Sequence, residues 1–200
     1  KVPGKSSRQS SRQKFINKIS RTLLLKTSGP TINHSQPKGV SAMANHCDNF
    51  LDLCGEDIKA LKAFQKLMGN EIDFNKVIPM PQALRDQGNL SIKDRQGPNW
   101  YDWAVIHWGT KWNAYEHNQD HTSARYPDNK GDCGELCYNF HTAWAPPTPI
   151  VRELQRQYPT LCITMYFEVE GNGDDTGWVD ETGKEVHAKP TQENGRRISG

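Results

Sequence analysis

Apolar and polar residues alternate without a break over residues 161–169. The apolar members are Leu161, Ile163, Met165, Phe167 and Val169. Because successive side chains of a strand point to opposite faces, this pattern predicts a strand whose odd-numbered side faces a core. Weaker alternation or short apolar runs predict further strands at residues 45–54, 72–78, 110–115 and 136–144, and we expect the last two to pair with each other. Turn residues at 171–175 and 181–184 predict a closing hairpin.

Apolar residues spaced three and four apart predict three helices, at residues 56–68, 99–108 and 150–158. Gly69 stands in the stop position of the first helix, and Pro149 is tolerated in the first turn of the third. Residues 82–98 and 116–134 are polar and contain Gly and Pro, so we expect connections there.

The order of these elements predicts an α+β fold. Strands and helices alternate, then a hairpin, a helix, a strand and a closing hairpin follow. This order fits a ferredoxin-like arrangement, a mainly antiparallel sheet with helices packed on one face. Of the 200 residues, we assign 43–188 to this domain, 1–42 to a basic leader expected to be disordered, and 189–200 to a frayed polar tail.

The charges are unevenly distributed. Residues 1–42 contain nine Lys or Arg and no acid, whereas the rest has 16 basic and 23 acidic residues, a net charge of −7. Such a leader fits a nucleic-acid-binding arm, an organellar transit peptide or a segment without a function of its own. Met43 stands where the folded sequence begins and could be the native start, in which case the leader would not belong to the native protein. The acidic remainder argues against duplex DNA as the main ligand of the domain.

The number of cysteines indicates the cellular compartment of the protein. There are five of them, an odd number, with no apolar signal segment ahead of them: Cys47, Cys54, Cys133, Cys137 and Cys162. This disfavours the disulfide framework of a secreted protein and predicts a reducing, cytoplasmic location. No apolar run approaches the roughly 18 residues of a membrane span, so no membrane association is expected.

Five sequence blocks occur in a characteristic order. They are Asn45-His-Cys-Asp-Asn-Phe50 with Cys54-Gly55, Phe74-Asn-Lys-Val-Ile-Pro-Met-Pro81, Asn99-Trp-Tyr-Asp-Trp103, His107-Trp-Gly-Thr-Lys-Trp-Asn113 and Phe140-His-Thr-Ala-Trp-Ala-Pro-Pro147. Together they resemble the YubB ferredoxin-like domain family of plasmid and prophage proteins, over residues 43–180. The resemblance implies a ferredoxin-like fold and a bacterial mobile-element setting, and the family has no established catalytic activity to carry over to these residues. Residues 1–42 and 116–134 lie outside it.

Two constellations carry candidate chemistry. His117, His121, Cys133 and Cys137 could close a tetrahedral zinc site. The alternative is a set of unrelated loop residues, because the predicted strand fixes the side-chain direction of Cys137. We therefore expect no cofactor, with zinc as the open alternative.

The second constellation is aromatic and basic: Trp108, Lys111, Trp112 and Trp144. A lysine between exposed rings can bind nucleobases and phosphate, or a protein surface. If the same rings face the helices, they are core residues instead.

Catalytic constellations are weak. His107 and Asp102 lie five residues apart and do not share a helical face, and adjacent residues such as His46 and Cys47 point to opposite sides of a strand. The sequence contains no phosphate loop, dinucleotide-binding glycine pattern or nucleophile elbow. It predicts a non-enzymatic binding module of a mobile element that engages a host or element-encoded protein. Nucleic-acid binding through residues 1–42 and the sheet aromatics, or a zinc-containing domain, are the alternatives.

Overall fold

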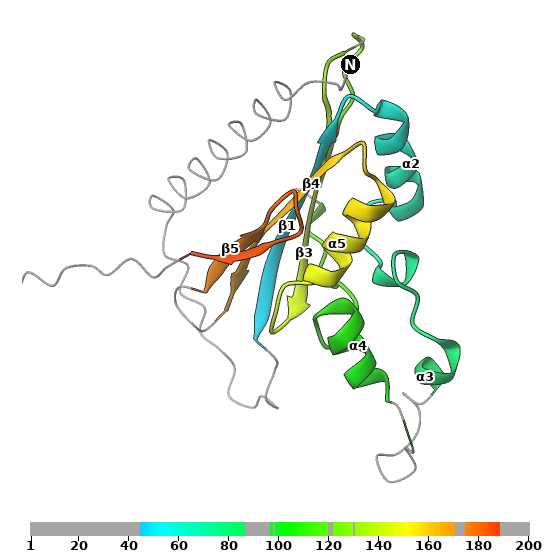
Figure 1. The fold of residues 1–200 in the computed structure, drawn as a ribbon, viewed down its shortest axis with the longest axis vertical. Coiled ribbons are helices and arrows are strands. Elements are labelled where there is room, and N and C mark those ends of the chain that lie inside the picture. The colour runs from blue at the N-terminus through cyan, green and yellow to red at the C-terminus, as the bar shows by residue number, and fades with distance from the viewer. Residues whose placement is uncertain are drawn as a thin grey trace, which may run out of the picture. The chain divides into compact units, whose positions relative to one another are not determined.

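Six antiparallel strands form one sheet in the order β2-β3-β1-β4-β5-β6 in the computed structural model (Figure 1). The structure describes residues 45–86, 97, 99–119, 122–129, 131–170 and 175–188, and the predictions for residues 1–42 and 189–200 lie outside them. The strands are β1 (His46–Gly55), β2 (Ser123–Arg125), β3 (Gly134–Ala143), β4 (Cys162–Val169), β5 (Thr176–Val179) and β6 (Glu185–His187). The helices of this part of the chain are α2 (Ile58–Met68), α3 (Gln82–Asp86), α4 (Trp100–Trp108) and α5 (Thr148–Gln157), with a short 3-10 helix at Phe74–Lys76.

Strand β1 lies at the centre of the sheet and pairs antiparallel with both β3 and β4. The segment β3–α5–β4 is thus a split β-α-β unit with β1 between its two strands. In this register Asp48 of β1 lies opposite His141 of β3 and Glu168 of β4. The predicted ferredoxin-like α+β fold is confirmed.

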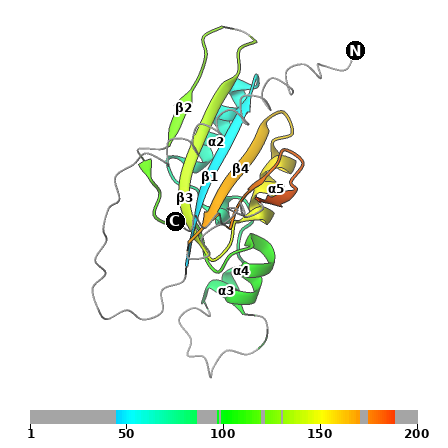
Figure 2. The same cartoon turned by 90° about the vertical axis from the view of Figure 1, so that its left-hand side faces the viewer.

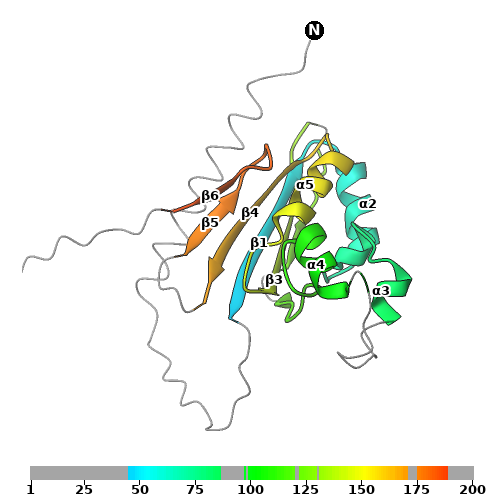
Figure 3. The same ribbon diagram turned by 60° about the horizontal axis from the view of Figure 1, so that its bottom comes forward.

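The helices α2, α4 and α5 cover one face of the sheet (Figure 3). The odd-numbered residues of β1 point to this side, and Leu51 and Leu53 are buried there against Leu61 and Phe64 of α2. The other side, which we call the open face, carries the even-numbered residues of β1 and has no helix of the described residues on it. Figure 2 shows β2, β3, β1 and β4 side by side in front of the helices.

Local capping sets the helix ends. The Asp57 side chain accepts a hydrogen bond from the Ala60 N–H (3.0 Å) at the start of α2, and Asn99 does the same for Asp102 N–H (2.8 Å) at the start of α4. Gly109 ends α4 in the left-handed region (φ 80°), where a Cβ atom would also lie 2.7 Å from Cδ of Pro149. No helix in the described part of the chain has the length and apolarity needed to cross a membrane.

Two predicted strands are absent. The segment 72–78 instead contains the 3-10 helix at Phe74–Lys76, because the Asp73 carboxylate caps Asn75 N–H (2.9 Å) and the distant Asn113 accepts from Phe74 N–H (2.8 Å). Residues 110–115 form no strand, and their predicted pairing with 136–144 is reduced to one bridge between Tyr115 and His141. The neighbours of β3 are β1 and the short strand β2, which the sequence pattern left inside a connection.

Candidate functional site

Exposed aromatic rings and titratable groups meet at the end of the sheet where β1 begins and β3 ends. We call the first group the aromatic patch: Tyr101, Lys111, Trp112 and Trp144. We call the second group the His–carboxylate cluster: His46, Asp48, Glu116, His141 and Glu170. Tyr115 joins them, because its ring centroid lies 6.2 Å from that of Trp112 and 5.7 Å from that of His46.

The aromatic patch is built around the Lys111 ammonium group. Its Nζ lies 4.4 Å from the ring centroid of Trp112 and 4.8 Å from that of Trp144, within cation–π distance of both. Tyr101 extends the patch with its ring 6.2 Å from Trp144. The three aromatic residues are 37%, 38% and 41% exposed in chain order. Large rings are rarely left this accessible together without a binding role.

Backbone geometry holds the patch in place. Trp144 adopts a left-handed conformation (φ 71°) directly after β3, and its N–H donates to Asn45 O (2.9 Å). The segment that carries Lys111 is fixed to the end of β3 by buried Thr110. The Thr110 hydroxyl donates to Ala143 O (2.8 Å) and accepts from Ala143 N–H (3.1 Å). The rings are therefore presented from an anchored loop.

Trp108 is a core residue, which corrects its prediction as a surface binding residue. Its side chain is buried, and the indole N–H donates to Ile78 O at 2.9 Å. The ring packs edge-on against Phe74 and Trp103 at centroid distances of 5.7 and 5.4 Å. The helical spacing of α4 turns Trp108 toward the sheet, whereas Lys111 and Trp112 follow the glycine that ends the helix.

The β1–β3 register brings the His–carboxylate cluster together. Asp48 Oδ1 lies 2.6 Å from Nε2 of His141, and Glu116 Oε2 lies 2.9 Å from Nδ1 of the same ring. Nδ1 of His46 is 3.0 Å from the Tyr115 hydroxyl. The five members of the cluster line a pocket of about 300 Å³.

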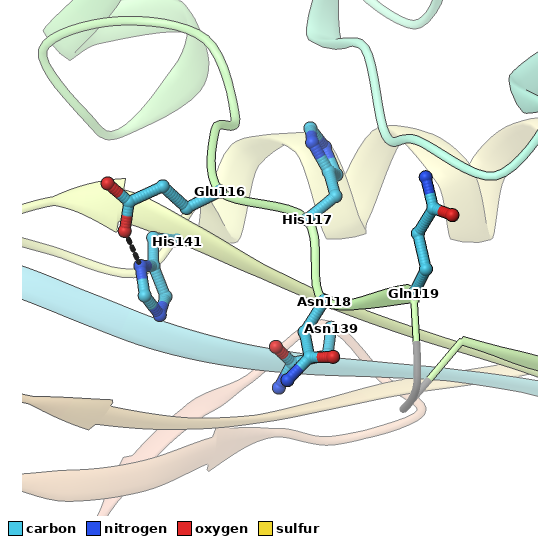
Figure 4. A pocket seen from close by; sticks show the side chains of 6 residues that line it. All are labelled: Glu116, His117, Asn118, Gln119, Asn139 and His141. Atoms are coloured by element: carbon cyan, nitrogen blue, oxygen red, sulfur yellow. Dashed lines mark hydrogen bonds and ion pairs between the residues drawn. The ribbon is translucent and has the colours of Figure 1, made fainter.

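Glu116 takes part through an unusual backbone conformation, with φ at 48°. Its carboxylate points to His141, whereas the next side chain, His117, points away from them (Figure 4). His117 Nε2 lies 3.1 Å from Ile72 O. A second, more open pocket of about 480 Å³ adjoins this segment, lined by Glu116, His117, Asn118, Gln119, Asn139 and His141.

The four residues of the predicted zinc site are placed as follows. His121 lies outside the described residues. His117 Nε2 lies 3.1 Å from Ile72 O, and Cys133 is a half-buried free thiol. Cys137 shares a group of close donor atoms with Asp52 and Glu135. The zinc site on His117, His121, Cys133 and Cys137 stays a prediction.

The cysteines offer no activated nucleophile at β1. Burial raises the pKa of Cys47 to about 12, so the thiol stays protonated at neutral pH. Cys54 lies opposite Cys162 across β1 and β4, and that neighbouring thiol together with burial raises the pKa of Cys54. All five cysteines are free thiols.

The open face carries mainly negative charge. Six carboxylates lie on it or at its end: Asp48, Asp52, Glu116, Glu135, Glu168 and Glu170. The six strands contain a single Lys or Arg, which is Arg125 of the short strand β2. Phe50 and Tyr166 stack at 5.9 Å among these acids. The face is thus acidic with an aromatic centre.

Residues 107–197 match the family model described as a ferredoxin-like domain in Api92-like protein. The match agrees with the fold and covers the patch residues Lys111, Trp112 and Trp144, whereas His46 and Asp48 precede it. It supports a ferredoxin-like domain family, but not the YubB name. No curated protein and no solved structure matches the chain.

Sequence reasoning missed the His–carboxylate cluster. His46 and His141 are 95 residues apart and come together only through the β1–β3 pairing. Both strands were predicted, but residues 136–144 were expected to pair with residues 110–115. The usable signal was the alternation itself, which places His46 and Asp48 on one side of β1.

Proposed function

We propose that the protein is a non-enzymatic binding module that docks a protein partner rich in Lys and Arg. The aromatic patch anchors apolar side chains of the partner, and the acidic open face meets its basic side chains. The observation that carries the proposal is the lysine held between two exposed tryptophans at one end of an open face that carries carboxylates along its strands.

The composition of the surface favours a protein over a nucleic acid. Trp and Tyr are enriched at the centres of protein interfaces, where a few such residues supply most of the binding energy. Phosphate groups would instead approach Asp48, Glu116 and Glu170 at the edge of the patch, and like charges disfavour that contact. Complementary charge favours a basic protein for the same reason.

The biological setting rests on sequence alone. The resemblance of five sequence blocks to plasmid and prophage proteins supports a partner encoded by the host or by the mobile element. The odd number of free thiols supports a reducing, cytoplasmic location. Residues 1–42 are strongly basic, so nucleic-acid binding is the alternative that the experiment has to distinguish from protein binding.

The test compares capture from host lysate by the full chain and by two variants, with and without nuclease. The double variant Trp112→Ala/Trp144→Ala removes the patch. Leu67→Ala is the matched control, because Leu67 is 42% exposed on α2. We expect one basic protein that wild type and the control retain after nuclease and that the patch variant loses.

The captured partner is then titrated as purified protein by calorimetry. We expect the patch variant to bind at least about tenfold more weakly, the effect of losing one interface hot spot, and added salt to weaken binding. Undiminished binding by the patch variant would overturn the proposal. So would capture that nuclease abolishes, which would assign the function to nucleic acid.

A further inference from the structure

The donor atoms of His46, Glu116 and His141 all lie within 4.8 Å of one another. A zinc ion binds imidazole nitrogen and carboxylate oxygen at about 2.0–2.2 Å, so two of its donors are at most about 4.4 Å apart. Small side-chain rotations bring the three groups to that separation. The three side chains come from β1, from β3 and from the segment before β2, so the fold holds them in register.

We propose that His46, Glu116 and His141 bind a first-row divalent transition metal ion, with zinc as the ion that this donor set suits best. Two imidazoles and one carboxylate form a donor set found in zinc proteins and in other first-row metal sites. Calcium and magnesium prefer oxygen ligands throughout. The metal site shares Glu116 with the acidic open face, but it uses no residue of the aromatic patch, and its test needs no protein partner.

The surroundings of the three ligands suit a metal. With the ion between Glu116 and Nδ1 of His141, the Nε2–H of that ring donates to Asp48 Oδ1, 2.6 Å away. A carboxylate in this position orients a histidine ligand and raises its basicity. Glu170 accepts from the His46 N–H (3.2 Å) and secures the start of β1.

Space and charge agree with the assignment. The pocket of about 300 Å³ beside the three ligands has room for the water or further donor that completes the coordination of the ion. Three carboxylates, of Asp48, Glu116 and Glu170, line this pocket together with two imidazoles. A dication offsets two of these three negative charges, and none of the described residues that line the pocket is Lys or Arg.

The location differs from the zinc site predicted from sequence. His117 belongs only to the predicted set, and its ring points away from Glu116 (Figure 4). Cys133 and Cys137 also belong only to that set. Variants at these positions therefore distinguish the two sites.

The test titrates zinc into the untagged full chain after a chelator has stripped it, using calorimetry and competition with a chromophoric chelator. Cobalt in place of zinc gives a visible absorption band that reports the coordination number. We expect a single ion per chain. His46→Ala and His141→Ala should each weaken zinc binding at least about 100-fold, and Asp48→Asn about tenfold, as expected for a residue that orients a ligand.

Two controls keep the result interpretable. His117→Ala and the double variant Cys133→Ser/Cys137→Ser should bind zinc as wild type does. Glu116→Gln replaces an exposed side chain, and should weaken binding with an unchanged circular dichroism spectrum even if a histidine variant fails to fold. The proposal is overturned if stripped protein takes up no stoichiometric zinc, or if binding survives Glu116→Gln and is lost in the cysteine variant.

Discussion

The two faces of the sheet divide stability and recognition between them. On the covered face, Leu51 and Leu53 of β1 are buried beneath α2 and α5. On the open face, the side chain of Asp48 is 42% exposed and Phe50 is half-buried between acidic neighbours. The same strand supplies both sets in alternation. Substitutions on the covered face should thus alter folding, and those on the open face should alter binding.

The largest effect is expected for Phe64→Ala on α2. Phe64 is fully buried and packs edge-on against Tyr138 and Tyr158. Its removal should cost about 3–5 kcal/mol in the free energy of unfolding, the usual range for a buried phenylalanine. Phe50→Ala on the open face should cost about 1 kcal/mol, the scale of a cross-strand aromatic pair. Urea unfolding followed by circular dichroism measures both. Equal losses in the free energy of unfolding would contradict the division of roles between the two faces.

Asn49→Leu tests a polar group on the covered side of β1. Asn49 is fully buried, and its amide donates to Cys47 O (2.8 Å), Phe140 O (3.3 Å) and Thr142 Oγ1 (2.9 Å). Leucine removes these donors, so we expect a loss of about 1–3 kcal/mol. An unchanged urea midpoint would show that this end of the covered face does not depend on the network.

Asp57→Ala tests the layer of helices rather than the sheet. Asp57 accepts from Ala60 N–H (3.0 Å) and from the Thr160 hydroxyl (2.9 Å), so the variant should lose about 1 kcal/mol. The Ala60 N–H lowers the pKa of Asp57, so this stabilisation is present above the unfolded pKa of about 3.9 and is lost as pH falls through the folded pKa. Asp57→Asn should keep most of the stability at neutral pH. Urea midpoints at pH 7 and below pH 4 provide the measurement.

The smallest effect is expected at the edge of the sheet, at His187 of β6. Hydrogen bonds to Asp175 (2.8 Å) and Glu185 (3.0 Å) raise the pKa of His187. A raised pKa stabilises the fold below the unfolded value of about 6.5, and this contribution is lost as pH rises through the folded pKa. Because the side chain is 53% exposed, solvent reduces the contribution to a fraction of a kcal/mol. His187→Asn should flatten the dependence of the urea midpoint on pH in this range, and an unaltered slope would contradict the assignment.

Elements with a strong local pattern could be predicted from sequence. The strand at residues 161–169 and the helices at 56–68 and 150–158 are confirmed, because alternation or helical spacing alone defines their buried side. The strand predicted at residues 72–78 is wrong, because Ile72 and Phe74 are both buried at a turn that Asn113, about 40 residues away, helps to hold. Local periodicity contains no trace of such a contact.

The candidate site divides in the same way. Lys111 and Trp112 are neighbours in sequence, so an aromatic and basic surface could be proposed from the chain alone. The burial of Trp108 depends on Ile78 accepting its indole N–H, which no spacing reveals. The contact between Glu116 and His141 could not be predicted, because it depends on the three-dimensional structure and on the positive φ angle of Glu116.

The central position of β1 has a consequence for synthesis on the ribosome. The first strand of the sheet to be made has both of its partners far downstream, since even the pair closest in sequence, Gly55 with Gly134, spans 79 residues. Contacts of this range are slow to form, and an unpaired strand is open to wrong association while the chain is being made. The acids at Asp48 and Asp52 interrupt the apolar character of this strand, as charged residues do where aggregation has to be prevented. The carboxylates assigned here to recognition would thus also keep the nascent strand apart from other chains until β3 emerges.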